Sequence, residues 1–172
     1  MFKIAGVILC IAGSTGYGIM KIETWKTAMK EMEQWILLFE KIKSYIYYRR
    51  DTITDIFCKM DNEIYGICGK YVTAVGYELR DNRSKDVFLA WKEIMAGWER
   101  NSTLPGKVKN CLMHFPEYVG EQDYEQQINH LDFFLEMLYR EKENLDKELD
   151  SKKKPVMAMS LGGGIMVSLL LL

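Results

Sequence analysis

Charge is absent from both ends of this chain, and that distribution constrains the fold more than any other feature of the sequence. All 24 acidic residues and all but one of the 23 basic residues lie in the region 21–154, whereas residues 4–20 and 155–172 carry no charge. As helices, these two segments would be roughly 25 and 27 Å long, close to the ~30 Å hydrocarbon core of a bilayer. The sequence therefore predicts an N-terminal transmembrane helix within 1–20 and a C-terminal one at 155–172.

Lysines border both predicted spans on the side of the central region. Lys21, Lys26 and Lys30 follow the first span, and lysines 152–154 directly precede the second. Because cytoplasmic loops of membrane proteins carry an excess of Lys and Arg, this bias places 21–154 in the cytoplasm. In one alternative, the first segment is a cleaved signal peptide. In another, the chain is a signal-anchored extracytoplasmic helical binding module, which requires the opposite orientation.

Apolar residues in the central region recur with a period of 3.6, and no stretch alternates with a period of two. The sequence therefore predicts an all-α fold, an antiparallel six-helix bundle with short connections between the two spans. The expected helices are Glu23–Tyr48, a short helix capped by Asp51 or Thr52 that ends near Met60, helices over 64–79 and 88–98, one from about Pro105 to Phe115, and a last one from Asp123 through Leu149. The expected core consists of Trp25, Trp35, Phe39, Trp91, Trp98, Leu131, Leu135 and Leu138.

The composition offers little catalytic chemistry. A net charge of −1 argues against a nucleic-acid partner, because such proteins usually carry a basic excess. The cysteines form no Cys-x-x-Cys pair, and we expect Cys58, Cys68 and Cys111 to be small core residues and His114 and His130 to be structural. No nucleotide-binding loop, nucleophile elbow or metal-ligand spacing occurs. We therefore expect no catalytic residue, no cofactor and no metal, with a membrane-bound enzyme of dispersed site as an alternative.

One segment before the last predicted helix matches a known pattern. It runs from Cys111 to Gln127 and resembles the Phe-Gly-x-x-Leu-Gly-x-x-Asp-x-x-x-Gln motif of the stage III sporulation protein AB family. The matching residues are Phe115, Gly120, Asp123 and Gln127. Pro116 and Val119 replace the glycine and leucine of the family pattern. The segment that starts at Phe39 is similar to the family's Leu-Glu-x-Glu-Ile-x-Tyr sequence, and the length and both charge-free ends also agree.

The resemblance implies a function that composition does not reveal. The family belongs to the sporulation-specific SpoIIIA channel complex, which links mother cell and forespore, and its members are similar to F-type platform proteins of type II secretion. The resemblance thus implies a location in the cell membrane on the mother-cell side, with the soluble domain cytoplasmic. It also implies contact with the secretion-type ATPase SpoIIIAA and other SpoIIIA-complex subunits, and a homo-oligomer is compatible with it.

The family residues also have plain structural interpretations. Gly120 suits a turn that needs a positive φ. Asp123 suits the N-cap of the last helix, with Gln126 completing a capping box, and Gln127 lies one turn into that helix. Direct contact with a partner is the alternative for each, and the sequence leaves both interpretations open.

Overall fold

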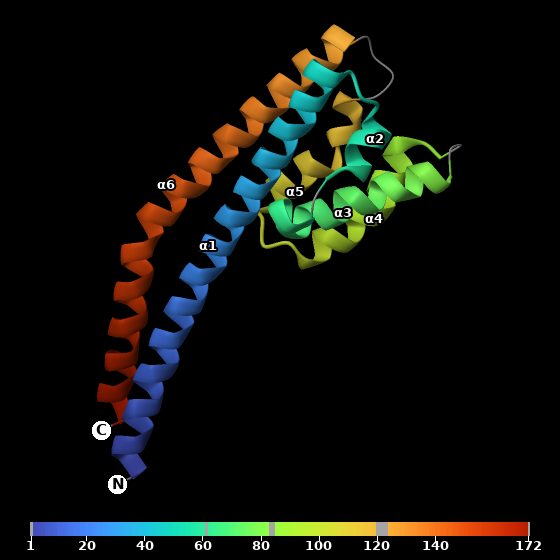
Figure 1. Cartoon of the computed structure of the whole chain (residues 1–172). Coiled ribbons are helices and arrows are strands. Elements are labelled where there is room, and N and C mark those ends of the chain that lie inside the picture. The colour runs from blue at the N-terminus through green and yellow to red at the C-terminus, as the bar shows by residue number, and fades with distance from the viewer. Residues whose placement is uncertain (1, 61, 83–84, 120–123, 172) are drawn as a thin grey trace. The chain divides into compact units, whose positions relative to one another are not determined.

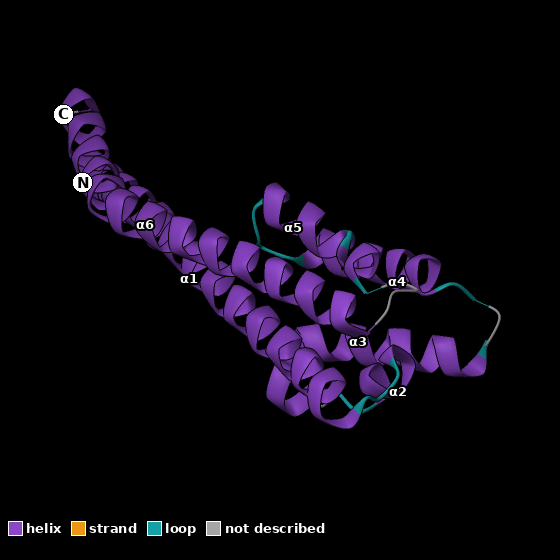
Figure 2. Cartoon of the chain, turned by 90° about the horizontal axis from the view of Figure 1, so that it is seen from above, coloured by secondary structure: helices purple, strands orange, loops and turns teal. Residues whose placement is uncertain are grey.

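The computed structural model describes residues 2–60, 62–82, 85–119 and 124–171. Side chains are described over these ranges except at residues 2–12, 62–65, 153, 161, 163–165 and 167–171. Over the described residues the chain forms six α-helices and one 3-10 helix, and contains no strand (Figure 1, Figure 2). The predicted all-α class and the six α-helices are therefore confirmed.

The chain divides into two compact units. Unit 1 consists of Met1–Thr27 and Glu143–Leu172, and unit 2 consists of Ala28–Lys142. The two longest helices, α1 (Phe2–Arg49) and α6 (Tyr124–Leu171), contribute residues to both units. The remaining helices belong to unit 2.

Within unit 1, α1 and α6 approach each other closely at Gly18. This glycine is buried, and a Cβ atom built on it would lie 2.5 Å from Oγ of Ser160. A larger residue would therefore force the two helices apart or displace the Ser160 side chain. On the surface of the same unit, Nζ of Lys147 lies 2.6 Å from Oε1 of Glu143, in the i,i+4 arrangement that favours helices.

The segments predicted to span the membrane are continuous with the neighbouring helices. Helix α1 begins at Phe2 and passes the predicted boundary at residue 21, and α6 continues through Pro155. In the part of the chain that the structure describes, no helix is long and apolar enough to cross a membrane. The two spans are thus not shown, and many of their side chains, among them those of residues 4–12 and 167–171, lie outside the described part.

Unit 2 contains the shorter helices, and side chains cap two of them. The shorter helices of unit 2 are α2 (Ile53–Cys58), α3 (Asn62–Asp81), α4 (Val87–Asn101), α5 (Gly106–Met113) and the 3-10 helix η1 (Phe115–Tyr118). Oγ1 of Thr52 accepts a hydrogen bond from the backbone N of Asp55 at 3.3 Å and so caps α2. Of the two predicted caps, Asp51 and Thr52, the structure therefore selects Thr52. Oδ1 of Asp86 caps α4 by accepting from the backbone N of Phe88 at 3.0 Å.

Helix α3 contains a kink that the sequence analysis did not predict. Gly66 has φ 54° and ψ −132°, a backbone conformation that L residues with a side chain rarely adopt. A Cβ atom at this position would also lie 2.8 Å from Nε2 of Gln34 on α1. Both constraints favour glycine where α3 passes α1.

The predicted fifth helix is divided in two. Helix α5 ends at Met113, and the predicted end near Phe115 falls inside η1. Pro116 occupies one of the first positions of η1, where a residue without a backbone N–H leaves no helical bond unmade. The proline therefore begins a new turn in addition to ending the previous helix.

Aromatic rings form the centre of unit 2. The largest fully buried aromatic side chains are Trp35, Phe39, Phe57, Trp91, Trp98, Phe115 and Phe134. Leu131, Leu135 and Leu138 of α6 are buried as well, so most of the predicted core is confirmed. The prediction was wrong for Trp25, which belongs to unit 1 and is only half-buried, with the ammonium of Lys21 6.0 Å from its ring centroid. The apolar stripe of α1 continues past the end of unit 2, and periodicity alone does not reveal where the packing partners stop.

Candidate partner-binding site

Phe115, the first residue of the family motif, lies in the centre of the core. Its side chain is fully buried, and its ring centroid lies 4.4 Å from that of Phe39 and 5.3 Å from that of Phe134. Burial of such a side chain stabilises the folded state by about 1.5–3 kcal/mol. Phe115 is therefore a packing residue and is not available to a partner.

Gln127 joins two elements next to that core. It is half-buried, and its Nε2 donates a hydrogen bond to the backbone O of Val119 at 3.2 Å. This bond ties the first turns of α6 to the residue that follows η1. Gly120 and Asp123 lie outside the described residues, so the predicted turn and N-cap stay predictions.

A surface depression of about 980 Å³ adjoins Gln127. Its lining residues come from the segment before α2, the start of α4, the region of η1 and α6, and are Asp51, Thr52, Ile53, Lys85, Asp86, Val87, Phe88, Pro116, Val119 and Gln127. All of them belong to unit 2. This depression is the candidate site that the family motif indicates, because Gln127 and Pro116 both line it.

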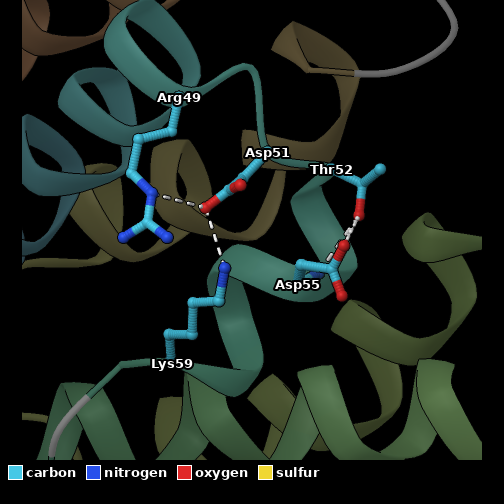
Figure 3. Close-up of polar contacts among 5 residues, drawn as sticks. All are labelled: Arg49, Asp51, Thr52, Asp55 and Lys59. Atoms are coloured by element: carbon cyan, nitrogen blue, oxygen red, sulfur yellow. Dashed lines mark hydrogen bonds and ion pairs between the residues drawn. The ribbon is translucent and has the colours of Figure 1, made fainter.

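Asp51 forms one charged edge of the depression. Its Oδ2 lies 2.8 Å from Nζ of Lys59 and 3.3 Å from Nε of Arg49 (Figure 3). The hydrogen bond from Lys59, helped by the charge of Arg49, holds the pKa of Asp51 below its usual range. Figure 3 also shows the neighbouring cap, in which Oγ1 of Thr52 donates to Oδ2 of Asp55 at 2.8 Å.

Lys85 is a second charged residue that lines the depression. Its Nζ lies 2.8 Å from Oε1 of Glu78 on α3 and 2.6 Å from Oε2 of Glu93 on α4. The hydrogen bonds to Glu78 and Glu93 raise the pKa of Lys85 above its usual value. The ammonium therefore connects the two helices of the α3–α4 hairpin, which lie side by side in Figures 1 and 2.

The charged groups of the depression are engaged with other groups of the fold. Asp51 and Lys85 sit in ion pairs, and Asp86 caps α4. A site whose ionic groups already have partners inside the fold is suited to holding helices together, and it offers an incoming ligand few free charges. Across the described residues, no group of three or more His, Cys, Asp or Glu side chains could hold a metal ion.

None of the described cysteines and histidines lines the depression. Cys68 is buried, which confirms its predicted core position and raises the pKa of its thiol, whereas Cys58 and Cys111 are only half-buried. Burial raises the pKa of Cys111 to about 11, so its thiol is protonated and weakly reactive at neutral pH. Nδ1 of His114, at the end of α5, lies 2.8 Å from Oε1 of Glu117. The imidazole of His130 on α6 lies edge-on to the ring of Tyr118 of η1, with the ring centroids 6.5 Å apart.

One buried carboxylate was not predicted from the sequence. Glu31 on α1 is only 9% exposed, and its carboxylate accepts hydrogen bonds from Nε1 of Trp98 at 2.7 Å and the backbone N of Thr103 at 3.2 Å. These bonds join α1 to the end of α4 and the loop after it. Its position in the sequence does indicate burial, because Glu31 lies three residues after Ala28 and four before Trp35, on the apolar stripe.

The fold and the depression define an all-α protein with an aromatic core and a polar surface site. The family profile described as stage III sporulation protein AB matches residues 3–172, and the chain therefore belongs to that family. The resemblance inferred from the motif is confirmed over the whole chain, and the protein is assigned to sporulation. Comparisons with curated proteins and with solved structures gave no match.

Proposed function

We propose that this chain is a non-catalytic membrane platform subunit of the sporulation-specific SpoIIIA channel complex. In this role it is anchored on the mother-cell side and docks the cytoplasmic ATPase SpoIIIAA. The observation that carries the proposal is the family match across residues 3–172, which covers the charge-free ends as well as the helical region. The similarity of the family to F-type platform proteins of type II secretion supports the platform role by analogy.

Two properties of unit 2 support a docking role over a catalytic one. Its centre is a closely packed set of aromatic rings, which gives a firm scaffold. The ionic groups of its charged depression are committed to ion pairs and to a helix cap. Groups that are committed in this way are poorly suited to catalysis, because proton transfer to a substrate needs an acid or base that is free to reach the reacting atom.

Membrane anchoring is supported by the sequence. Charge-free segments at 4–20 and 155–172, each bordered by lysines, favour insertion with the central region in the cytoplasm. In fractionated cells, the full chain should remain with the membranes after carbonate washing. Recovery of the chain in the soluble fraction would contradict the anchoring.

Orientation is tested with an impermeant thiol reagent and the variant Asp146→Cys, because Asp146 is an exposed residue of α6. The proposal expects labelling only after the cells are permeabilised. The parent chain, with its native cysteines, is the matched control. Labelling of Asp146→Cys in intact cells would overturn the cytoplasmic location and favour the extracytoplasmic binding module.

The ATPase contact is tested by retention of purified SpoIIIAA on the immobilised full chain in detergent. We expect retention by the parent and by Asp123→Asn, because asparagine is as good an N-cap as aspartate. If Asp123→Asn keeps its thermal stability and loses the ATPase, the family motif is itself a contact site. If the parent chain retains no ATPase, the docking role is wrong.

A further inference from the structure

Exposed tyrosines gather in unit 2 where α1 ends and α6 begins. Tyr47 and Tyr48 are 54% and 79% exposed, and their ring centroids lie 4.9 Å apart in an edge-to-face arrangement. Cζ of Arg50 lies 5.3 Å from the ring centroid of Tyr124. Tyrosine and arginine are the residue types that most often contribute binding energy at protein interfaces.

These residues border a groove between α1 and α6. The groove consists of two adjoining hollows of about 440 and 530 Å³, which share Tyr47 and Ile128. The other lining residues are Glu40, Lys43, Ser44, Tyr48 and Asp132 in the first hollow, and Arg50, Tyr124, Glu125 and Asn129 in the second. Along α1, the distance from Glu40 to Arg50 corresponds to about 15 Å, enough for two or three turns of a helix or about five extended residues.

The charges of the groove are unequally satisfied. Lys43 forms an ion pair with Asp132, and Glu40 accepts a hydrogen bond from the hydroxyl of Tyr139. Within the described part of the chain, Arg50 contacts the Tyr124 ring but no carboxylate. Glu125 lies in the first turn of α6, where the helix dipole stabilises its negative charge. Arg50 is therefore the cation of the groove that can still receive a carboxylate.

The backbone holds this arginine in an unusual conformation. Arg50 has φ 51°, which residues with a side chain rarely adopt, and its backbone N donates to the O of Ile46 at 3.2 Å. Next to it, the hydroxyl of Tyr124 donates to the backbone O of Tyr47 at 2.9 Å. Local strain that the surrounding contacts maintain is common at binding sites, because it presets the position of a side chain.

We propose that this groove binds a short segment of the ATPase that presents a carboxylate to Arg50 and an apolar side chain to the gap between Tyr47 and Ile128. The inference rests on the proposed function and names the surface that performs it. The unpaired guanidinium supplies the charge complementarity, and the exposed tyrosine rings supply contact area with few rotatable bonds. The depression beside Gln127, whose ions are already paired, is assigned to holding the helices together.

The test compares matched variants of the full chain in detergent, immobilised and titrated with SpoIIIAA. Arg50→Glu and Tyr48→Ser alter the groove. Arg100→Glu on α4 and Phe133→Ser on α6 make corresponding changes at exposed residues that do not line it. Removal of an interface anchor typically weakens binding by about tenfold or more. We expect a rise in Kd of at least that size for both groove variants and a change of less than about twofold for both controls.

Added salt provides a second measurement. The parent Kd should rise with salt concentration, and the Kd of the charge-neutral variant Arg50→Gln should rise less steeply, because one ionic contact is missing. Thermal melting of each variant confirms that it is folded. Equal binding by parent and groove variants would overturn the groove assignment and leave the platform role standing. Absence of binding by the parent would overturn both, and loss of self-association in place of ATPase binding would assign the groove to a second copy of this chain.

Discussion

Two sets of aromatic rings in unit 2 are used in opposite ways. Phe39, Phe115 and Phe134 meet in the core, with centroids 4.4 to 5.3 Å apart, and are shielded from solvent. Tyr47 and Tyr48, about two turns further along α1, remain largely exposed. The three phenylalanine rings carry no polar atom, whereas the two exposed tyrosine rings carry hydroxyl groups.

The difference follows from what each of these positions on α1 packs against. Phe39 contacts Phe115 of η1 and Phe134 of α6, and its burial is complete. Tyr47 contributes its backbone O to a hydrogen bond with Tyr124 and keeps its ring at the surface. Aromatic content alone therefore does not distinguish core from interface, and the neighbouring elements decide it.

The largest expected effect comes from truncating a core ring. Phe115→Ala should lower the free energy of unfolding by about 3–5 kcal/mol, because a large buried ring is replaced by a cavity. Phe133→Ala, on an α6 residue that is 60% exposed, is the matched control and should change it by less than about 0.5 kcal/mol. Urea unfolding of both variants measures the difference. Similar costs for the two would mean that the core is misassigned.

The buried carboxylate gives the next largest effect. Glu31→Ala leaves the indole N–H of Trp98 and the backbone N–H of Thr103 without their acceptor, which should cost about 1–3 kcal/mol. Glu33→Ala removes only an exposed ion pair with Lys142 and should cost no more than about 1 kcal/mol. Thermal unfolding distinguishes the two, and an unchanged stability of Glu31→Ala would show that these bonds contribute nothing.

A smaller effect is expected where the tyrosines border the groove. Tyr124→Phe removes the hydroxyl that donates to the backbone O of Tyr47, at a cost of about 0.5–1.5 kcal/mol. Tyr48→Phe is the control, because the hydroxyl of Tyr48 forms no hydrogen bond with the residues that the structure describes. If both variants melt at the same temperature, the hydroxyl of Tyr124 does not fix the end of α1.

The smallest effect is a pH dependence at the turn between α1 and α2. The pKa of Asp51 in the folded chain lies below its usual value, so its contribution to stability is present above the usual value and is lost as the pH falls through the folded pKa. The parent should therefore lose more stability than Asp51→Asn between about pH 5 and pH 2. Melting temperatures measured over that range test this. Parallel curves would mean that the ion pairs with Lys59 and Arg49 contribute no pH-dependent stability.

The helical class, the number of α-helices and most of the core could be predicted from the sequence. A 3.6-residue period over 134 residues leaves no other regular structure available, and large apolar residues on such a stripe are buried wherever a partner helix exists. Family membership could also be predicted, because Phe115 and Gln127 occur at a fixed spacing that composition does not impose. Trp25 shows the limit of this reasoning, since its place on the stripe did not make it a core residue.

Only the tertiary structure decided which polar groups are shared between elements. The acceptor role of Glu31 depends on Trp98, 67 positions away. Lys85 pairs with two glutamates seven and eight positions away on two different helices. Arg50 contacts the ring of Tyr124, 74 positions away, and no carboxylate among the described residues. The left-handed conformation of Arg50 has no signal in the sequence, because glycine or asparagine is the usual residue there. Local periodicity determined where helices form, since each turn depends on its nearest neighbours. The groove and its free charge arose from long-range packing, which no short window of sequence contains.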